Sequence, residues 1–557
     1  MIIEISGRKL TPEAVAKVAL SPAGKVRLVL SQDAVQRIKE ARKYVNEIAT
    51  KRNAPVIYGV NTGFGSLAYE RVSLNYARLL QRYLITSSCV GVDGFYEREA
   101  VRAAMLVRAN TLAMGYSGVR VDVVQTLLEM LNRGVTPLVP KKGSVGSGDL
   151  APLAHIAIVF TKDPRKSVQV KEQMILEKLK KGKKIAEKEK KFLIKQSGEA
   201  FLECDGTLKR MSGIEAMESA GIKRIVLEAK EGLSLVDGSS FSAGLACLAV
   251  YRAGTLIKAS DKIASLSLEA LKALETPFSD ELITTRPHIG MIKTAKSIRN
   301  NLSSSSLVIH TDQIQNSDNV LKDFGKVQDA TSLRCIPQVH GAVKDVFEFV
   351  RNKIKTEINS ATDNPLIITK SIHKNKAYSG GNFHDEIVGF TMDFLAIAIA
   401  ELASISERRI YRLLSREANQ GLPPYLIDLK GKTKGLMSGA MLLQYVAASL
   451  VSQNKVLCHP GVVDSIPTSE NIEDHVSMTP VSANKCLEVI NNTEYTLAIE
   501  LWCSVVALRL RQKKQEGKPS SIAKRIETIV SKIVPEFSED RVLYDEIEEL
   551  RRAINKL

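Results

Sequence analysis

The sequence predicts a mainly α-helical protein, in which an N-terminal region of short helices and loops is followed by a bundle of long helices. Proline and glycine concentrate before about residue 150 and become sparse afterwards. No proline occurs between Pro365 and Pro423, where apolar residues recur at three- and four-residue intervals. No set of alternating β-branched runs competes with these helical patterns.

The N-terminal region is expected to span residues 1–200. Its segments VNTGFGSLA, GVDGFYE and VTPLVPKKGSVGSGDLAP are too rich in glycine and proline for regular structure. Within it, residues 162–195 form a basic insertion with 13 Lys or Arg and 5 Asp or Glu, and without an aromatic residue before Phe192. We predict a solvated helical appendage that lacks an apolar face and has no catalytic function.

The remaining residues, 201–557, are expected to form the long-helix bundle and C-terminal helices. Long helices are predicted at about 246–274 and 435–456. A third is indicated by an apolar stripe that continues to Leu402 and Ile405 and begins with Ile387, Phe390, Phe394 and Ile397.

The composition is typical of a soluble globular protein, with 44% hydrophobic and 25% charged residues among 557, and excludes a disordered or collagen-like chain. We see no apolar run long enough to span a bilayer. The first residues, MIIEISGRKLTPEAV, lack the succession of basic, apolar and small residues that is typical of a signal peptide, so we expect a cytoplasmic protein. The seven cysteines are scattered without a C-x-x-C pair, which predicts neither disulfides nor a zinc site. Nearly half of the net charge of +17 lies in the insertion, so we expect no nucleic-acid partner.

The densest group of glycine and small polar residues is Gly143-Ser-Val-Gly-Ser-Gly-Asp149, followed by LAPLAH. Such a run permits close backbone approach, either to a phosphate at a helix start or within a tight turn. The Gly-Lys-Ser/Thr ending of a P-loop is absent. Taken alone, such a run is more often a flexible loop than a functional site.

GSVGSGDLAPLAH resembles the GSVGASGDLAPLAH signature of the histidine and phenylalanine ammonia-lyase family. Further segments resemble the same family in the same order, namely YGVNTGFGSLA, KEGLSLVDG, QDATSLRCIPQV, NSATDNPL, SGGNFHDE and VVDSIPTSENIEDHVSM. The last of these is most similar to the histidine branch.

The resemblance implies a helical homotetramer in which several subunits contribute to each active site. It also implies a methylideneimidazolone, an electrophile that would form here by cyclisation and double dehydration of Gly146, Ser147 and Gly148. Removing ammonia from an amino acid requires such an electrophile for the amine and a base for the weakly acidic β-proton. By resemblance Tyr58 is the base, for which a lowered pKa is needed, and Arg334 binds the substrate carboxylate.

Other matched positions have less defined roles. Asn61, Gln328, Phe383 and Glu473 are expected either to contact substrate or to serve packing and hydrogen-bond networks. The spacing of His155, His384 and His475 is wrong for a metal triad, so we predict ordinary hydrogen-bonded histidines and no metal.

Five departures from the family pattern fall on the chemistry. The first is that the prosthetic-group segment is one residue short, with glycine in place of alanine; ring closure does not involve the alanine methyl, but a shorter loop holds the turn differently. Asp237 replaces an asparagine and brings either a charge or a raised pKa. Thr331 replaces a tyrosine, Ser87-Ser88 replaces the Ser-His of the histidine branch, and Gln453 replaces a glutamate linked to imidazole binding.

These observations predict a carbon–nitrogen lyase that converts histidine to urocanate and ammonia. The alternatives are an ammonia-lyase or aminomutase for another amino acid, and a catalytically silent family member that acts as a binding or regulatory scaffold. The residues expected to bind substrate are Ser88, Asn61, Asp237, Gln328, Thr331, Arg334, Phe383 and Gln453.

Overall fold

The computed structural model describes residues 1–51, 54–427 and 435–557, and these residues form two compact units. The first unit comprises Met1–Tyr251, Arg351–Met392 and Pro460–Asn484, and the second comprises Arg252–Val350, Asp393–His459 and Lys485–Leu557. This division differs from the predicted boundary at residue 200. Two later stretches of the chain return to the first unit, which a division made along the sequence could not show.

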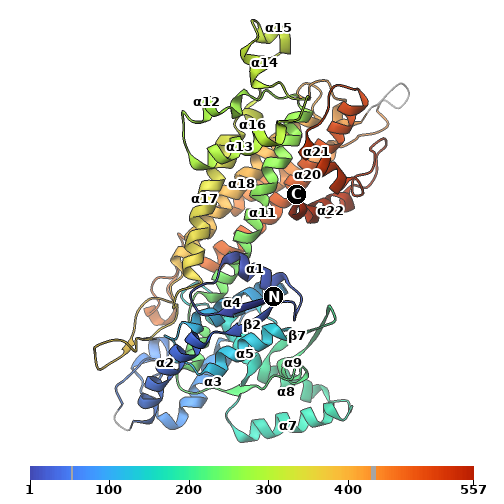
Figure 1. The fold of residues 1–557 in the computed structure, drawn as a ribbon. Helices are drawn as coiled ribbons and strands as arrows, with labels where there is room; N and C mark the ends of the chain where they lie inside the picture. Colours follow the sequence, from blue (N-terminus) through green and yellow to red (C-terminus); the bar gives the residue numbers. More distant parts are fainter. Residues whose placement is uncertain (52–53, 428–434) are drawn as a thin grey trace. The chain divides into compact units, whose positions relative to one another are not determined.

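The first unit combines helices with short strands (Figure 1). Its helices are α1 (Pro12–Leu20), α2 (Gln32–Thr50), α3 (Ala77–Ser88), α4 (Arg98–Ala113), α5 (Val121–Asn132), α6 (Leu150–Phe160), α7 (Lys166–Lys180), α8 (Glu187–Ser197), α9 (Gly213–Ser219) and α10 (Glu231–Val236). β1 (Ile2–Ile5) pairs in parallel with β2 (Arg27–Leu30), and β7 (Glu199–Cys204) lies between β4 (Val135–Pro137) and β8 (Thr207–Ser212) in an antiparallel sheet. Two short pairs join β3 (Val92–Phe95) to β5 (Pro140–Lys142) and β6 (Thr161–Lys162) to β9 (Ile225–Val226), and a third joins β10 (Leu366–Ile367) to β11 (Ala377–Tyr378).

Helix α4 lies in the core of the first unit, where residues 100–113 are all buried. Two of these buried residues are arginines. Arg102 donates to the carbonyl oxygens of Leu131 and Val18, and Arg108 donates to those of Ser234 and Asp237. Because buried guanidinium groups need partners, these bonds fix α4 against α1 and α5 and against the C-terminal end of α10, which Asp237 follows.

The basic insertion does have an apolar face, so this part of the prediction was wrong. Ile175 on α7, Leu193 on α8 and Ile214 on α9 form a small buried core. Beside it, Arg224 forms a buried ion pair with Glu172 at 3.0 Å. Apolar residues are sparse in this segment, but each of the three helices contributes one to the same small core. The high lysine content made this apolar face hard to recognise in the sequence.

The second unit consists mainly of helices. Those within it are α12 (Asp280–Ile283), α13 (Ile289–Leu302), α14 (Thr311–Gln315), α15 (Val320–Phe324), α16 (Thr331–Arg334), α19 (Met441–Leu457), α21 (Ser521–Val530) and α22 (Tyr544–Ala553). Four longer helices have residues in both units, namely α11 (Ser240–Ala270), α17 (Ile336–Glu357), α18 (Glu386–Leu414) and α20 (Thr479–Lys513). The mainly helical class is confirmed, and α11, α18 and α19 are the long helices predicted near 246–274, 387–405 and 435–456.

Buried polar contacts join the long helices within the second unit. Arg409 on α18 pairs with Glu500 on α20 at 2.5 Å, and both side chains are fully buried. Ser267 on α11 donates to the same carboxylate at 2.6 Å. A buried charge pair with additional hydrogen bonds favours one arrangement of the three helices over alternatives.

Two helical stretches, Glu231–Ala270 and Glu386–Leu414, are long and apolar enough to cross a membrane by length and composition, although we expected no such run. The most apolar window of the first is entirely buried within the protein, and 61% of that of the second is buried. Core helices of globular proteins have these properties.

Candidate active site

The glycine-rich segment forms a tight turn between β5 and α6 in the first unit. Asp149, which precedes α6, is fully buried. It accepts hydrogen bonds from the backbone N–H and the hydroxyl of Ser242 at 2.8 and 3.0 Å, and from the Ser144 hydroxyl at 3.1 Å. Burial raises the pKa of Asp149, and these hydrogen bonds oppose the rise. The carboxyl therefore anchors the end of the turn.

Two other chain segments hold the turn from outside. The Gly148 N–H donates to the Phe383 carbonyl at 3.2 Å, and Ser147 forms a β-bridge with His384. From the segment before α20, the Ser477 hydroxyl donates to the Gly146 carbonyl at 2.9 Å and the Met478 N–H donates to the Val145 carbonyl at 2.8 Å. The predicted triad is thus held at both of its ends.

Both glycines of the triad are required by this geometry. Gly146 has φ +81° and Gly148 has φ +77°, values that residues with side chains rarely adopt. A Cβ at Gly146 would lie 2.1 Å from Ser477 Oγ, and one at Gly148 would lie 2.7 Å from Asp237 Oδ1. The alanine of the family pattern therefore has no space here, which gives a physical reason for glycine at position 146.

Asp237, the residue that replaces an asparagine, is buried at the end of α10. Burial raises its pKa to about 8, with a further contribution from Asp363, while Arg108 and Lys230 oppose the rise. At neutral pH the side chain is therefore mostly protonated. Of the two outcomes that the sequence left open, the structure supports the raised pKa, and a neutral carboxyl stands in for a neutral amide.

A second buried carboxyl, Asp385, lies on the other side of the turn. Its Oδ1 is 2.5 Å from Ser477 Oγ, and its Oδ2 is buried without a hydrogen-bond partner in the described residues. Burial raises the pKa of Asp385 well above its usual value, and the nearby Asp149 adds to the rise. Hydrogen bonding with the Ser477 and Thr479 side chains opposes this rise.

Tyr58 lies in a turn before the NTGFG segment and is half-buried. Its hydroxyl oxygen accepts a hydrogen bond from the Gly65 N–H at 3.0 Å, and its ring meets Phe64 edge-on. Burial nevertheless raises the pKa of Tyr58, so the lowered value that a base needs is not reached in this arrangement. The oriented donor is present, but the desolvation of the phenolate outweighs it.

Asn61 and Ser88 also belong to the first unit. The Asn61 side chain accepts from the Ile57 N–H at 2.8 Å and donates to the Pro55 carbonyl at 3.0 Å, which favours the network role over substrate contact. Ser88 is half-buried at the last turn of α3.

The other four predicted residues belong to the second unit. Gln328 and Thr331 are exposed. Arg334 ends α16, and its Nε is buried without a hydrogen-bond partner in the part of the chain that the structure describes. On α19, exposed Gln453 accepts a hydrogen bond from Asn492 at 3.2 Å. The predicted site residues therefore come from both units.

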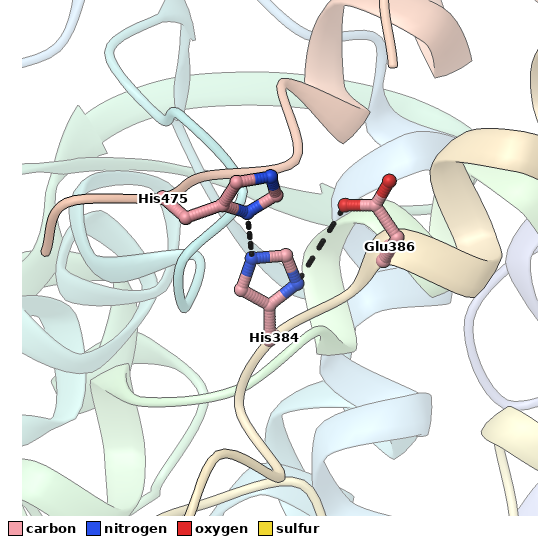
Figure 2. Close-up of side chains that lie close together, drawn as sticks. All are labelled: His384, Glu386 and His475. Carbon is pink, nitrogen blue, oxygen red and sulfur yellow. Dashed lines mark hydrogen bonds and ion pairs between the residues drawn. The ribbon is translucent and has the colours of Figure 1, made fainter. Parts of the chain in front are cut away.

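Two of the predicted histidines lie next to each other (Figure 2). His384 Nε2 is 3.3 Å from His475 Nδ1, the rings are stacked, and His384 Nδ1 is 3.8 Å from a carboxylate oxygen of Glu386. This confirms a hydrogen bond between the two histidines, whereas Glu386 lies only at ion-pair distance. The ligand atoms of the three side chains lie within 4.8 Å of one another, so these residues could hold a metal ion, which their spacing in the sequence did not indicate. For His155 the structure differs, because its Nε2 is buried without a partner among the described residues and burial lowers its pKa.

The sequence analysis missed Asp385 and Ser477 as site residues. Both lie inside segments that carried the family resemblance, SGGNFHDE and the end of VVDSIPTSENIEDHVSM. Their contact with Gly146 depends on bringing together three segments separated by more than 90 residues. No local pattern in the sequence signals such a contact.

Comparison with known proteins identifies relatives over nearly the whole chain. A family model described as aromatic amino acid lyase matches residues 10–532. Histidine ammonia-lyase from Caldanaerobacter subterraneus subsp. tengcongensis is 43% identical over 98% of this chain and 95% of its own length. Among solved structures, histidine ammonia-lyase from Trypanosoma cruzi is 32% identical with a TM-score of 0.83, covering 100% of this chain and 94% of that one. Tyrosine aminomutase from Streptomyces globisporus is 31% identical with a TM-score of 0.85, covering 100% and 97%.

Proposed function

The chain belongs to the aromatic amino acid lyase family, and from that membership we propose that it is an ammonia-lyase that converts histidine to urocanate and ammonia. Curated relatives named as histidine ammonia-lyases are 39 to 43% identical over nearly the whole chain. These relatives support histidine as the substrate and ammonia release as the reaction.

The turn at Gly146, Ser147 and Gly148 is the observation that carries the proposal. Enzymes of this family use an internal methylideneimidazolone, an electrophile that captures the substrate amine and makes it a better leaving group. In this chain the Gly148 nitrogen and the Gly146 carbonyl are each fixed by a hydrogen bond, and neither residue has a side chain to obstruct their approach. The residues present therefore fit the formation of this group.

Tyr58 and Arg334 are the side chains to which we assign proton transfer and carboxylate binding. The hydrogen bond from the Gly65 N–H to the Tyr58 oxygen would stabilise a phenolate, and a cationic group close to the ring would also act to lower the pKa of Tyr58. Arg334 has a buried Nε without a partner in the described residues, so one edge of its guanidinium is available for a carboxylate.

We further propose a cytoplasmic homotetramer in which several subunits complete each active site. On α18 the side chains of Ile387, Phe390, Phe394 and Ile397 are 37 to 45% exposed at helical spacing. On α19 further large apolar side chains are exposed, among them Leu442 and Val456. Apolar residues arranged in this way are typical of protein interfaces. In such an assembly, the site residues of the second unit can serve an active site based on another subunit.

Intact mass tests the prosthetic group, and product analysis tests the reaction. We expect freshly purified protein to be lighter than its encoded mass by two waters, and a Ser147→Ala control to keep the encoded mass. With histidine, ammonia and the ultraviolet absorbance of urocanate should appear together. Full encoded mass in the wild-type protein would refute the proposal and favour the alternative of a catalytically silent scaffold, which the replacements Thr331 and Gln453 also favour. Formation of a β-amino acid would instead indicate an aminomutase.

A further inference from the structure

The contacts around Ser477 fit a protonated Asp385. The Ser477 hydroxyl has one proton, and its contacts include the Gly146 carbonyl at 2.9 Å and Asp385 Oδ1 at 2.5 Å. The Thr479 hydroxyl lies 2.7 Å from Ser477 Oγ, where either oxygen can donate, and 3.0 Å from the backbone carbonyl oxygen of Asp385. If Ser477 donates to Gly146, the proton in its short contact with Asp385 comes from the carboxyl group.

The burial of Asp385 agrees with this count of protons. The side chain is fully buried, and its second oxygen has no partner in the described residues, which leaves a charged carboxylate poorly solvated. Asp149 and Glu357 are close enough to disfavour a further negative charge. A protonated Asp385, the Ser477 hydroxyl and the Gly146 carbonyl oxygen therefore form a continuous donor chain.

The carbonyl oxygen at the end of this chain is an atom that ring closure must remove. The Gly148 nitrogen bonds to the Gly146 carbonyl carbon, the oxygen gains two protons and leaves as water, and a double bond forms from that carbon to the Ser147 nitrogen. The Gly148 and Ser147 N–H groups each release one proton, which balances the two that leave with the oxygen. The second water comes from the Ser147 side chain.

We propose that Ser477 delivers the proton to the Gly146 carbonyl oxygen during ring closure and that Asp385 is the positioning residue that supplies and later recovers it. This inference rests on the proposed function, because it concerns how the prosthetic group of that enzyme forms. General acid assistance at a poor leaving group is commonly worth on the order of 100-fold or more in rate. Asp385 acts only through Ser477, and Ser477 alone touches the reacting atom.

The experiment follows prosthetic-group formation by mass rather than by activity. Full-length protein is made in a cell-free reaction, and the fraction that has lost two waters is measured over time. Asp385→Asn keeps the size of the side chain and removes the acidic proton, and Ser477→Ala removes the hydroxyl. We expect each to slow the mass loss on the order of 100-fold, and the double variant to be no slower than the slower single one, because both act in one chain.

Two controls separate proton supply from structural support. Ser477→Thr keeps a hydroxyl and should restore much of the rate that Ser477→Ala loses. Glu269→Gln removes another buried carboxyl, which also has a raised pKa but accepts its hydrogen bonds from Ser305 and Ser520, and this variant should lose its waters at the wild-type rate. Circular dichroism and sedimentation of each variant verify that it is folded.

The outcomes distinguish this inference from the proposed function. If the wild-type protein never loses two waters, the proposed function itself fails. If it does, and folded Asp385→Asn matures at the wild-type rate, only the inference is overturned. Should Asp385→Asn fail to fold, Ser477→Ala decides: maturation at the wild-type rate would overturn the inference, and slowed maturation restored by Ser477→Thr would support it.

Discussion

Replacing Asp237 by asparagine should stabilise the protein at neutral and alkaline pH. Asp237 is buried beside Gly148, near Asp363, Arg108 and Lys230, and its pKa is raised to about 8. Above the usual pKa of an aspartate, the unfolded chain loses this proton while the folded protein keeps it. Because its proton is lost only in the unfolded chain, Asp237 favours unfolding as the pH rises. Asparagine has nearly the same shape and nothing to deprotonate, so the variant should not lose stability in this way.

The size and sign of the effect follow from the two pKa values. Between pH 4 and 8 the folded state binds more protons than the unfolded state at this position, so the free energy of unfolding falls as the pH rises. Each pH unit in this range lowers the free energy of unfolding by about 1.4 kcal/mol. The rise of the Asp237 pKa from 3.8 to about 8 therefore sets an upper limit on the stabilisation expected from Asp237→Asn. This limit is about 6 kcal/mol above pH 8 and about 4 kcal/mol at pH 7, and little stabilisation is expected at pH 4.

The assay compares denaturation midpoints of the wild-type and Asp237→Asn proteins from pH 5 to pH 9. The contributions of other titrating groups are common to both proteins, so the difference between them isolates Asp237. As a matched control, Asp363→Asn breaks the fully buried pair with Lys230 and should destabilise at every pH. An Asp237→Asn protein with the wild-type pH dependence would show that Asp237 is charged in the folded state and refute the reasoning.

Four further outcomes are expected. Tyr58→Phe should lower kcat by about 100- to 10,000-fold, and Arg334→Lys should chiefly raise KM because lysine lacks the guanidinium fork; unchanged turnover in the phenylalanine variant would reassign the base. The double change Ser88→His and Gln453→Glu should raise the rate with histidine relative to phenylalanine and tyrosine, measured by ammonia release, unless imidazole binding lies elsewhere. Ile175→Ala should lower stability by about 2 to 5 kcal/mol, and an unaffected denaturation midpoint would show that the insertion is not packed on its neighbours.

The fold was largely predictable because its signals are local. The apolar spacing of α18 and the absence of proline between Pro365 and Pro423 are properties of one continuous stretch, and α18 follows from them. The domain boundary was not predictable in this way, since residues 351–392 and 460–484 return to the first unit. Whether a later segment belongs to the first unit depends on packing between distant parts of the chain. The local composition of the sequence does not show such packing.

In the candidate site, too, the sequence predicted local features and missed those that depend on distant segments. The resemblance placed Gly146, Ser147 and Gly148, whose identities are visible in the sequence. It did not predict the direction of the Tyr58 pKa, because burial depends on neighbours from distant segments and outweighs the Gly65 donor. His384 and His475 were judged by their sequence spacing, which is uninformative for residues that lie in contact although they are 91 positions apart.

The glycine at position 146 and the buried acid beside it fit together in space. In this chain a methyl group on residue 146 would lie 2.8 Å from Asp385 Oδ1 as well as 2.1 Å from Ser477 Oγ. Asp385 therefore occupies the side of the turn where an alanine side chain at this position would project. The glycine leaves room for the Asp385 carboxyl, which contacts the Ser477 hydroxyl, and that hydroxyl donates to the Gly146 carbonyl whose oxygen ring closure must remove.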